Sequence, residues 1–142
     1  MSPADDTRTL KGGPVAKRIM AEVARDAAKA TAEGFPPKLV SITVGDVEAV
    51  GVYVRNQRAK AEQAGIGFEE RNFPADLTAA ELEAAIHGMN ADPRVTGIII
   101  QRPVPRHIPI KAIQAAVHPL KDVEGMHPAS IGNIVYNQLD LA

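Results

Sequence analysis

The chain of 142 residues contains no cysteine. This absence excludes disulfide bonds, thiolate zinc sites and cysteine nucleophiles, and it fits a reducing cytosol. A charge excess of one sign is absent too, because 16 lysine and arginine residues are balanced by 17 aspartate and glutamate residues. The sequence therefore lacks the basic surface that attracts nucleic acids and anionic membranes, and we expect neither as a partner.

Long apolar runs are also missing. No stretch approaches the roughly 20 apolar residues that a membrane-spanning helix needs. Residues 1–13, MSPADDTRTLKGG, have aspartates and no apolar centre, which excludes a secretory signal. We expect a soluble cytoplasmic protein of one domain, because a hydrophobic content of 45% is enough to build a core.

Several motifs that carry chemistry do not occur. Neither G-x-G-x-x-G nor G-x-x-x-x-G-K-[ST] is present, so the chain has no recognisable phosphate cradle. The four histidines match no metal-ligand spacing, and we expect no metal. Ser2, Ser41 and Ser130 lie in no G-x-S-x-G elbow, which argues against acyl-transfer chemistry.

Hydrophobic periodicity predicts alternating helices and strands. Residues 14–32 have apolar side chains every fourth position, at Val15, Ile19, Val23 and Ala27, which predicts an amphipathic helix. The β-branched stretch KLVSITVG predicts a buried strand that ends at Gly45. The expected elements that follow are a helix over 48–64, a strand in IGFEERNFP, a helix in LTAAELEAAIHGMNAD, a strand in DPRVTGIIIQ and a short helix over 108–117.

Two of these boundaries have specific signals. Gly65 stands where a helix C-cap glycine belongs. Thr78 followed three residues later by Glu81 is the capping-box pattern of a helix start. The C-terminal IGNIVYNQLDLA is instead strand-like and lacks a closing helix, so we expect a domain boundary there.

This alternation predicts an α/β fold, with an open, mostly parallel sheet and helices on both faces in three layers. Residues 1–12 are expected to form an arm, and residues 13–142 one domain. Ligands of such folds gather at the carboxyl ends of the strands. Two segments qualify, namely the one after Val44 and QRPVPRH after Ile100.

Polar side chains occur at or near these strand ends. Gln101 ends a buried strand, where its amide needs hydrogen-bond partners. Tyr53 and Gln57 lie one turn apart on one face of a predicted helix, and Lys121–Gly125 places alternating charges in a loop. On spacing alone, a structural role explains each of them better than a functional role. The structural roles are ordinary packing for Tyr53, a solvated helix position for Gln57, a bond to nearby backbone for Gln101 and a plain turn for Lys121–Gly125.

Four longer stretches carry a resemblance to a known family. They are, in order, PPKLVSITVGD, YVRNQRAKAEQAGI, TGIIIQRPVPRHI and HPLKDVEGMHPASIGNI. Together they resemble the N-terminal catalytic domain of bifunctional methylenetetrahydrofolate dehydrogenase/methenyltetrahydrofolate cyclohydrolase. The similarity runs from about Leu10 to the C-terminus, and the Q-x-P-x-P and K-D-V-[DE]-G blocks are specific in combination.

The resemblance implies a two-domain, multifunctional enzyme of one-carbon metabolism. A tetrahydrofolate derivative would lie in the cleft between the domains, and NADP or NAD would bind to a Rossmann domain that is absent from this chain. The full-length protein would be a homodimer in the cytoplasm. A chain that ends before the cofactor domain would be inactive as a dehydrogenase by itself.

By position, the resemblance also implies site residues. Tyr53 would stack on the folate, Gln101 would position the one-carbon centre, and Glu124 would accept hydrogen bonds from the pterin. The loop that lines the pterin pocket would be Pro103, Val104 and Pro105.

The chain departs from the family pattern at the chemical centre. The family motif is Y-x-x-x-K, with the lysine as acid/base group of the cyclohydrolase, and Gln57 occupies its position. An amide cannot exchange a proton near neutral pH, and such a loss costs on the order of 10²–10⁴ in rate. Glu124 replaces the usual aspartate, Gly51 a common serine, and Arg102 a common apolar residue.

We therefore expect folate binding and dehydrogenase activity, with a weakened cyclohydrolase. Hydride transfer depends less on the missing lysine, since a neutral Gln57 does not repel the cation that forms. An alternative is a non-catalytic module that binds a folate or pterin. A further alternative is a scaffold whose cleft binds nothing.

Overall fold

The computed structural model describes residues 11–46 and 48–138. The helices and strands predicted between residues 14 and 117 are confirmed, and residues 1–10 of the predicted arm lie outside the described part. The elements are α1 (Gly12–Ala32), β1 (Lys38–Val44), α2 (Glu48–Gln63), β2 (Gly67–Phe73), α3 (Ala79–Ala91), β3 (Gly97–Ile100), α4 (Ile110–Ala116), the 3₁₀ turn η1 (Pro119–Lys121) and α5 (Pro128–Val135).

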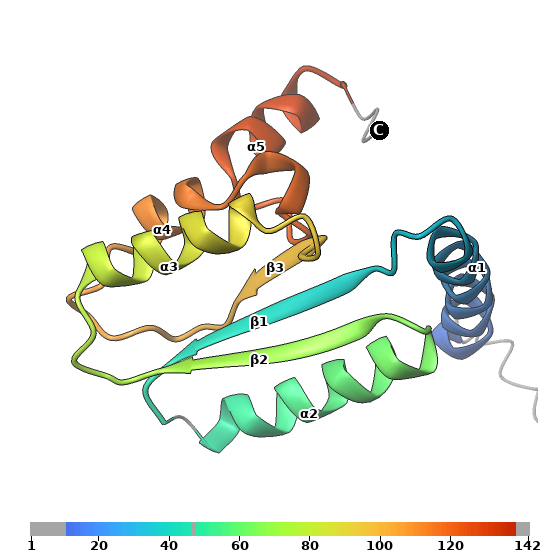
Figure 1. The fold of residues 1–142 in the computed structure, drawn as a ribbon, viewed down its shortest axis with the longest axis horizontal. Helices are drawn as coiled ribbons and strands as arrows, with labels where there is room; N and C mark the ends of the chain where they lie inside the picture. The colour runs from blue at the N-terminus through green and yellow to red at the C-terminus, as the bar shows by residue number, and fades with distance from the viewer. Residues whose placement is uncertain (1–10, 47, 139–142) are drawn as a thin grey trace, which may run out of the picture.

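The strands form one parallel sheet in the order β2-β1-β3 (Figure 1). Leu39 of β1 lies opposite Phe68 on one side and Gly97 on the other. Because all three strands run in the same direction, their carboxyl ends meet at one edge of the sheet. The predicted parallel α/β arrangement is confirmed.

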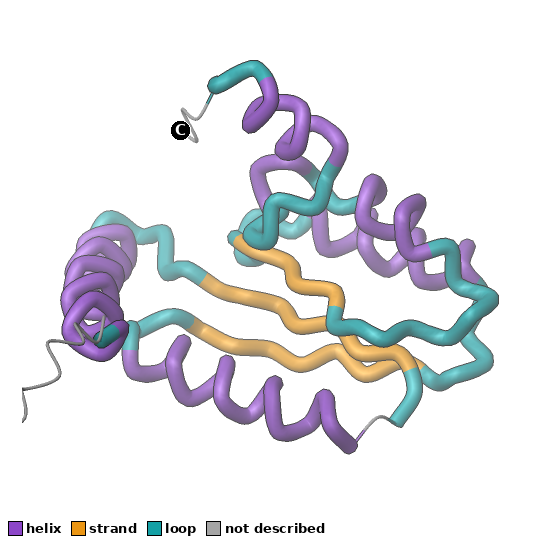
Figure 2. The backbone as a smooth tube through the Cα atoms, turned by 180° about the vertical axis from the view of Figure 1, so that it is seen from behind, coloured by secondary structure: helices purple, strands orange, loops and turns teal. Residues whose placement is uncertain are grey.

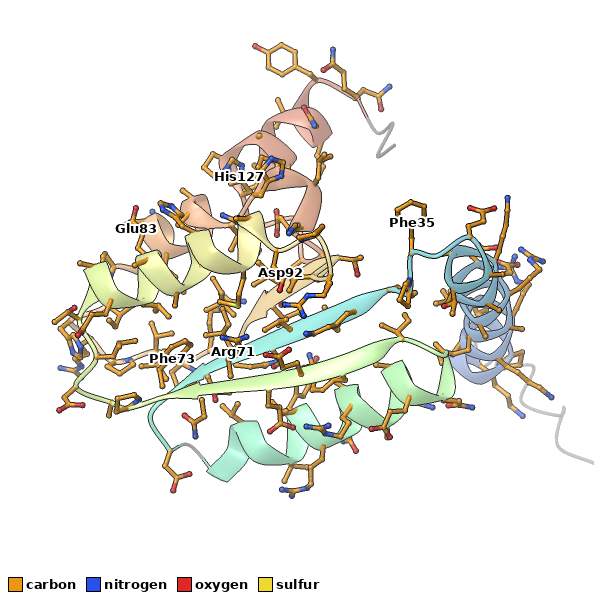
Figure 3. The ribbon with its side chains drawn as sticks, in the orientation of Figure 1. Phe35, Arg71, Phe73, Glu83, Asp92 and His127 are labelled. Atoms are coloured by element: carbon orange, nitrogen blue, oxygen red, sulfur yellow. The ribbon has the colours of Figure 1, made fainter. Side chains whose placement is uncertain are left out.

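Helices cover both faces of this sheet, as predicted. Figures 1 and 2 show α2 on one face, and α3 and α4 on the other. The main core lies on the α3/α4 side, where alternate β1 residues meet Leu82, Ile86 and Ile113. The core consists of Val40, Ile42, Val44, Leu82, Ile86, Met89, Val95, Ile98, Ile100, Ile108, Ile113 and Val117, and Phe73 packs against it (Figure 3).

Local signals explain where α3 begins and α2 ends. The Thr78 hydroxyl oxygen accepts a hydrogen bond from the Glu81 N–H at 3.2 Å, and the Glu81 carboxylate accepts one from the Thr78 N–H at 2.9 Å. This is the predicted capping box. Gly65 has φ +73°, a conformation that glycine adopts without strain, just after α2.

The helix α1 is confirmed, but its apolar face is not buried by the described chain. Ala27 is the buried residue of this helix, whereas Val15, Ile19 and Val23 are exposed. The helix lies at one end of the sheet rather than on a face (Figures 1 and 2). Phe35, just after it, is also exposed (Figure 3).

The prediction for the C-terminal segment is wrong in its described part, because Pro128–Val135 is a helix and not a strand-like piece. The His127 ring nitrogen Nδ1 accepts the Ala129 N–H at 3.0 Å and so caps the helix. Residues 139–142 lie outside the described part, and the expected domain boundaries remain predictions. Among the described helices, none has the length and apolar content to cross a membrane.

Candidate functional site

A hollow of about 340 Å³ opens at the carboxyl edge of the sheet, and we call it the Tyr53 hollow. It joins side chains from three separate segments: Tyr53 from α2, Gln101 from the end of β3, and Glu124 from the loop before α5. The Tyr53 side chain is 64% exposed, so its ring offers a face to a ligand. The lining residues are Val50, Tyr53, Ile100, Gln101, Arg102, Pro103 and Glu124.

Gln101 is almost fully buried, with 7% of its surface exposed, and its amide bonds to side chains rather than to nearby backbone. Its Nε2 donates to Ser41 Oγ at 2.9 Å and to Gln57 Oε1 at 2.6 Å. The three residues come from β3's end, β1 and α2. Gln57 therefore contacts Gln101, although it does not line the Tyr53 hollow.

Glu124 has an electrostatic environment unlike that of an open surface carboxylate. Partial burial raises the pKa of its carboxyl group, and the nearby Arg102 charge and a backbone hydrogen bond from Ile100 offset this only in part. When ionised, this carboxylate can accept hydrogen bonds from a ligand that donates N–H groups.

Lys121 fixes the loop that carries Glu124. Its ammonium group donates to the carbonyl oxygens of Met89, Asn90 and Asp92 at 2.9, 2.7 and 2.8 Å. These carbonyls close the C-terminal end of α3, which otherwise leaves acceptors without intrahelical donors. The lysine of the K-D-V-E-G block is thus a structural anchor.

Asp122 anchors the other side of the same loop. Burial opposes its ionisation, but hydrogen bonds from the backbone N–H groups of His127 and Met126 prevail and lower the pKa of its carboxyl group. The two donors lie 2.7 and 3.1 Å from its oxygens. Asp122 also forms a parallel bridge with Ile98, so the loop runs along the edge of β3.

The predicted pocket loop is only partly in the Tyr53 hollow. Pro103 lines it, whereas Val104 packs against the main core and neither Val104 nor Pro105 is among the lining residues. A role of Val104 and Pro105 in direct substrate contact remains a prediction without support from this geometry.

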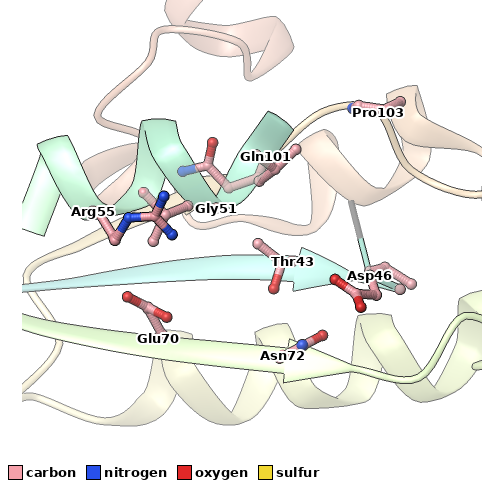
Figure 4. A pocket seen from close by; sticks show the side chains of 12 residues that line it. Thr43, Asp46, Gly51, Arg55, Glu70, Asn72, Gln101 and Pro103 are labelled. Atoms are coloured by element: carbon pink, nitrogen blue, oxygen red, sulfur yellow. The ribbon is translucent and has the colours of Figure 1, made fainter. Parts of the chain in front are cut away.

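A second cavity of about 170 Å³ lies between α2 and the sheet, next to the Tyr53 hollow (Figure 4). Val50, Gln101 and Pro103 line both. Its other labelled polar side chains come from the strands, from α2 and from the turn between β1 and α2, and the sequence alone predicted no role for them. They are Thr43, Asp46, Arg55, Glu70 and Asn72.

Gly51 lies in the wall of this second cavity. A side chain there would place its Cβ 3.4 Å from an Arg55 guanidinium nitrogen, which is ordinary contact. The glycine is therefore not required by packing, and it leaves room where a larger residue would fit.

The described residues contain no group of three or more histidine, cysteine, aspartate or glutamate side chains that could hold a metal ion. What this edge of the sheet does present is a stacking surface, an amide and a carboxylate. Together they suit a flat ligand with several N–H groups rather than a metal ion.

Comparison with known proteins identifies relatives over nearly the whole chain. The family model for the catalytic domain of tetrahydrofolate dehydrogenase/cyclohydrolase matches residues 10–124. The chain is 80% identical over 142 residues to Bifunctional protein FolD 2 of Mesorhizobium japonicum, covering 100% of this chain and 46% of that protein. It is 54% identical to Bifunctional protein FolD 3 of Roseobacter denitrificans, covering 96% and 46%.

Solved structures give the same match. A methylenetetrahydrofolate dehydrogenase from the silkworm Bombyx mori superposes with a TM-score of 0.86 at 34% identity, over 92% of this chain and 45% of that one. A Trypanosoma brucei dehydrogenase-cyclohydrolase, in complex with NADP cofactor and inhibitor, has a TM-score of 0.83 at 27% identity, over 94% and 46%. The chain thus spans about half the length of the relatives it matches.

Proposed function

The chain belongs to the tetrahydrofolate dehydrogenase/cyclohydrolase family, and we propose that it is the folate-binding part of a methylenetetrahydrofolate dehydrogenase of one-carbon metabolism. The observation that carries this proposal is the convergence of Tyr53, Gln101 and Glu124 on one hollow at the carboxyl edge of the sheet. The three side chains come from distant parts of the sequence.

The chemistry of these groups suits a reduced folate. The exposed ring of Tyr53 offers a stacking face, and a carboxylate such as Glu124 can accept two hydrogen bonds from the amino and ring N–H groups of a pterin. Gln101 belongs to the wall of the same hollow and would contact the one-carbon unit. We propose Tyr53, Gln101, Pro103 and Glu124 as substrate-binding residues.

The described residues do not fit a dinucleotide cofactor. The turn after β1 carries one glycine, Gly45, and the next residue is Asp46, whose carboxylate would repel a pyrophosphate. NADP or NAD is therefore proposed to bind to a domain outside this chain, and the isolated chain to be inactive as a dehydrogenase. The full-length protein is proposed to be a cytoplasmic homodimer, which gel filtration and cell fractionation would test.

The cyclohydrolase activity is proposed to be weak, because Gln57 stands where the family has a lysine. Gln57 accepts a hydrogen bond from Gln101, and an amide supplies no exchangeable proton near neutral pH. In the full-length protein, Gln57→Lys should raise methenyltetrahydrofolate hydrolysis by on the order of 10²-fold or more. Hydrolysis by the unmodified protein at rates typical of the family would refute the proposal.

Titration of the chain with tetrahydrofolate in a calorimeter tests the folate site directly. Binding that Glu124→Gln weakens would support it, and no binding at high micromolar folate would count against it. The alternative of a non-catalytic folate-binding module predicts the same titration, but no dehydrogenase activity in the full-length protein with either NADP or NAD.

A further inference from the structure

Arg102 is an exposed residue in the wall of the Tyr53 hollow, and it stands at a position where the chain departs from the family pattern. Its guanidinium group takes part in none of the hydrogen bonds, ion pairs or cation–π contacts that the described residues form. Those ion pairs engage other arginines, namely Arg18, Arg25, Arg58, Arg71 and Arg94. A guanidinium group carries several N–H donors, so those of Arg102 are left for a ligand or for water.

Arg102 and Glu124 are the two charged residues among those that line the hollow. They lie close enough for one to influence the other. Burial raises the pKa of the Glu124 carboxyl group, and the charge of Arg102 is the strongest influence that lowers it. Nevertheless, no ion pair of the described chain joins the two side chains. A cation and a carboxylate thus line the same hollow without contacting each other, and both remain able to bind one polar ligand at the same time.

One side of a pterin ring combines hydrogen-bond donors with an acceptor. The 2-amino group and the ring N–H at position 3 donate, and the neighbouring 4-oxo group accepts. A carboxylate such as Glu124 satisfies the two donors, but it repels the 4-oxo group because both are acceptors. A guanidinium group is a donor only and supplies what the carboxylate lacks. A carboxylate and a guanidinium group together therefore suit this side of the ring better than a carboxylate alone.

We propose that Arg102 is a specificity-determining residue, which donates a hydrogen bond to the 4-oxo group of the pterin while Glu124 accepts hydrogen bonds from the adjacent N–H groups. The inference rests on the proposed folate site. The hollow therefore selects a 2-amino-4-oxopteridine over a ring with an amino group at position 4. That amino group is a donor, so it offers no acceptor to Arg102.

The glutamate tail of folate offers Arg102 a second kind of acceptor, since arginine also binds carboxylates. The tail, however, is joined to the opposite end of the ring system from the 2-amino group. Arg102 lies near Glu124, which under the proposed function holds the 2-amino group. Its position therefore favours a contact with the ring over a contact with the tail.

Variants of the full-length protein isolate the guanidinium group. Arg102→Met keeps an unbranched side chain but removes the charge and the donors, whereas Arg102→Lys keeps a charge and N–H donors. Arg106→Met is the control, because Arg106 is exposed in the same segment between β3 and α4 and does not line the hollow. Since Arg102 has no side-chain partner in the described part of the chain, none of these changes should lower the urea midpoint.

The measurement is the ratio of the affinities for tetrahydrofolate and for its 4-amino-4-deoxy analogue, by calorimetric titration at neutral and at mildly alkaline pH. The two ligands share the glutamate tail and differ at the ring. We expect Arg102→Met to lower the ratio about 10- to 100-fold, the equivalent of one hydrogen bond to a charged group, through weaker binding of tetrahydrofolate. Arg102→Lys should keep most of the ratio, and Arg106→Met should keep all of it.

The outcomes separate this inference from the proposed function. If Arg102→Met weakens the binding of both ligands equally, Arg102 contacts the tail, and the inference fails while the folate site stands. An unchanged ratio in Arg102→Met would overturn the inference as well. So would a loss that disappears at mildly alkaline pH, because Arg102 would then only keep Glu124 ionised. A protein that binds neither ligand would contradict the proposed function and the inference together.

Discussion

The two faces of the sheet differ in chemistry although the same strand builds both. On the α3/α4 face, β1 contributes Val40, Ile42 and Val44 to a closed apolar core. On the α2 face it contributes Ser41 and Thr43, which lie near Gln101 and the second cavity. The pleat of one strand thus separates the residues that stabilise the fold from those that shape the site.

The sequence of β1 already carries a sign of this division. Strands of a parallel sheet that are buried on both faces usually form continuous apolar runs. In KLVSITV, hydroxyl residues interrupt the run at alternate positions, and these positions share one face. Such an alternation in a buried parallel strand can mark which face will carry a polar site.

The largest expected effect comes from opening the apolar face. Leu82 of α3 is fully buried, and Leu82→Ala should lower the free energy of unfolding by about 2–5 kcal/mol. Because Leu82 lies across the sheet from α2, folate affinity of the folded protein should change little. Urea titration and calorimetry measure the two quantities. Leu120→Ala is the control, since Leu120 is 76% exposed and should change stability by no more than about 0.5 kcal/mol.

The next largest effect concerns the edge carboxylate. Glu124→Gln should weaken tetrahydrofolate binding about 10- to 100-fold at neutral pH, because hydrogen bonds to a charged group are lost. Since burial raises the pKa of Glu124, affinity of the unmodified protein should fall as the pH drops, beginning above the ordinary carboxyl value of 4.5. This acid limb should be absent in Glu124→Gln. At neutral pH the free energy of unfolding of Glu124→Gln should not be lower than that of the unmodified protein. The reason is that a raised carboxyl pKa means that the charged form is disfavoured in the folded state. An unchanged acid limb would assign it to another group.

A smaller effect is expected when an apolar residue replaces Gln101, so that the α2 face of the sheet resembles the apolar α3/α4 face. Gln101→Leu leaves the buried Ser41 hydroxyl without its partner and should cost about 1–3 kcal/mol of stability. In the double variant Ser41→Ala with Gln101→Leu both partners are apolar, so most of this loss should be recovered. Folate affinity should remain reduced by about tenfold in both variants. A double variant with full affinity would show that this network is not part of the site.

The smallest effect concerns Asp122, which lies on neither face. Asp122→Asn should lower stability by about 1 kcal/mol at neutral pH, because one of two backbone N–H groups loses its carboxylate acceptor. The pKa of Asp122 is lowered from its ordinary 3.8, so its contribution is present above that pH and is lost as the pH falls below it. Urea midpoints of the two proteins should therefore converge in acid. A gap that persists at low pH would assign the effect to packing.

The sequence could predict the elements of this fold because their signals are local. The capping box at Thr78 and Glu81 and the glycine after α2 involve residues close in the chain. The error at α5 arose from a conflict between two local signals. Ile131, Ile134 and Val135 have helical spacing, but their β-branched side chains favour strands. The His127 cap and the Asp122 acceptor resolve this conflict in favour of a helix, and each lies within five residues of the backbone N–H group that it binds.

The site could be predicted only where a family motif marked it. Tyr53, Gln101 and Glu124 were named through the resemblance, and the structure places them in one hollow. Ser41 was missed because it is 60 residues from Gln101 in the sequence, and no local pattern links the two. The exposure of the apolar face of α1 was not predicted either, since periodicity shows that a helix has an apolar face but not what covers it.

The anchors of the loop that carries Glu124 have a consequence for how the residue at that position can vary. Lys121 and Asp122 hold the loop through bonds to α3 and to the backbone ahead of α5, and Gly97 lets the loop pass close to β3, where a Cβ would come within 2.6 Å of Val123. None of these restraints uses the side chain at position 124. These three restraints would therefore stay in place if an acidic residue of another length stood at position 124, and under the proposed function such an exchange would change which pterin is accepted.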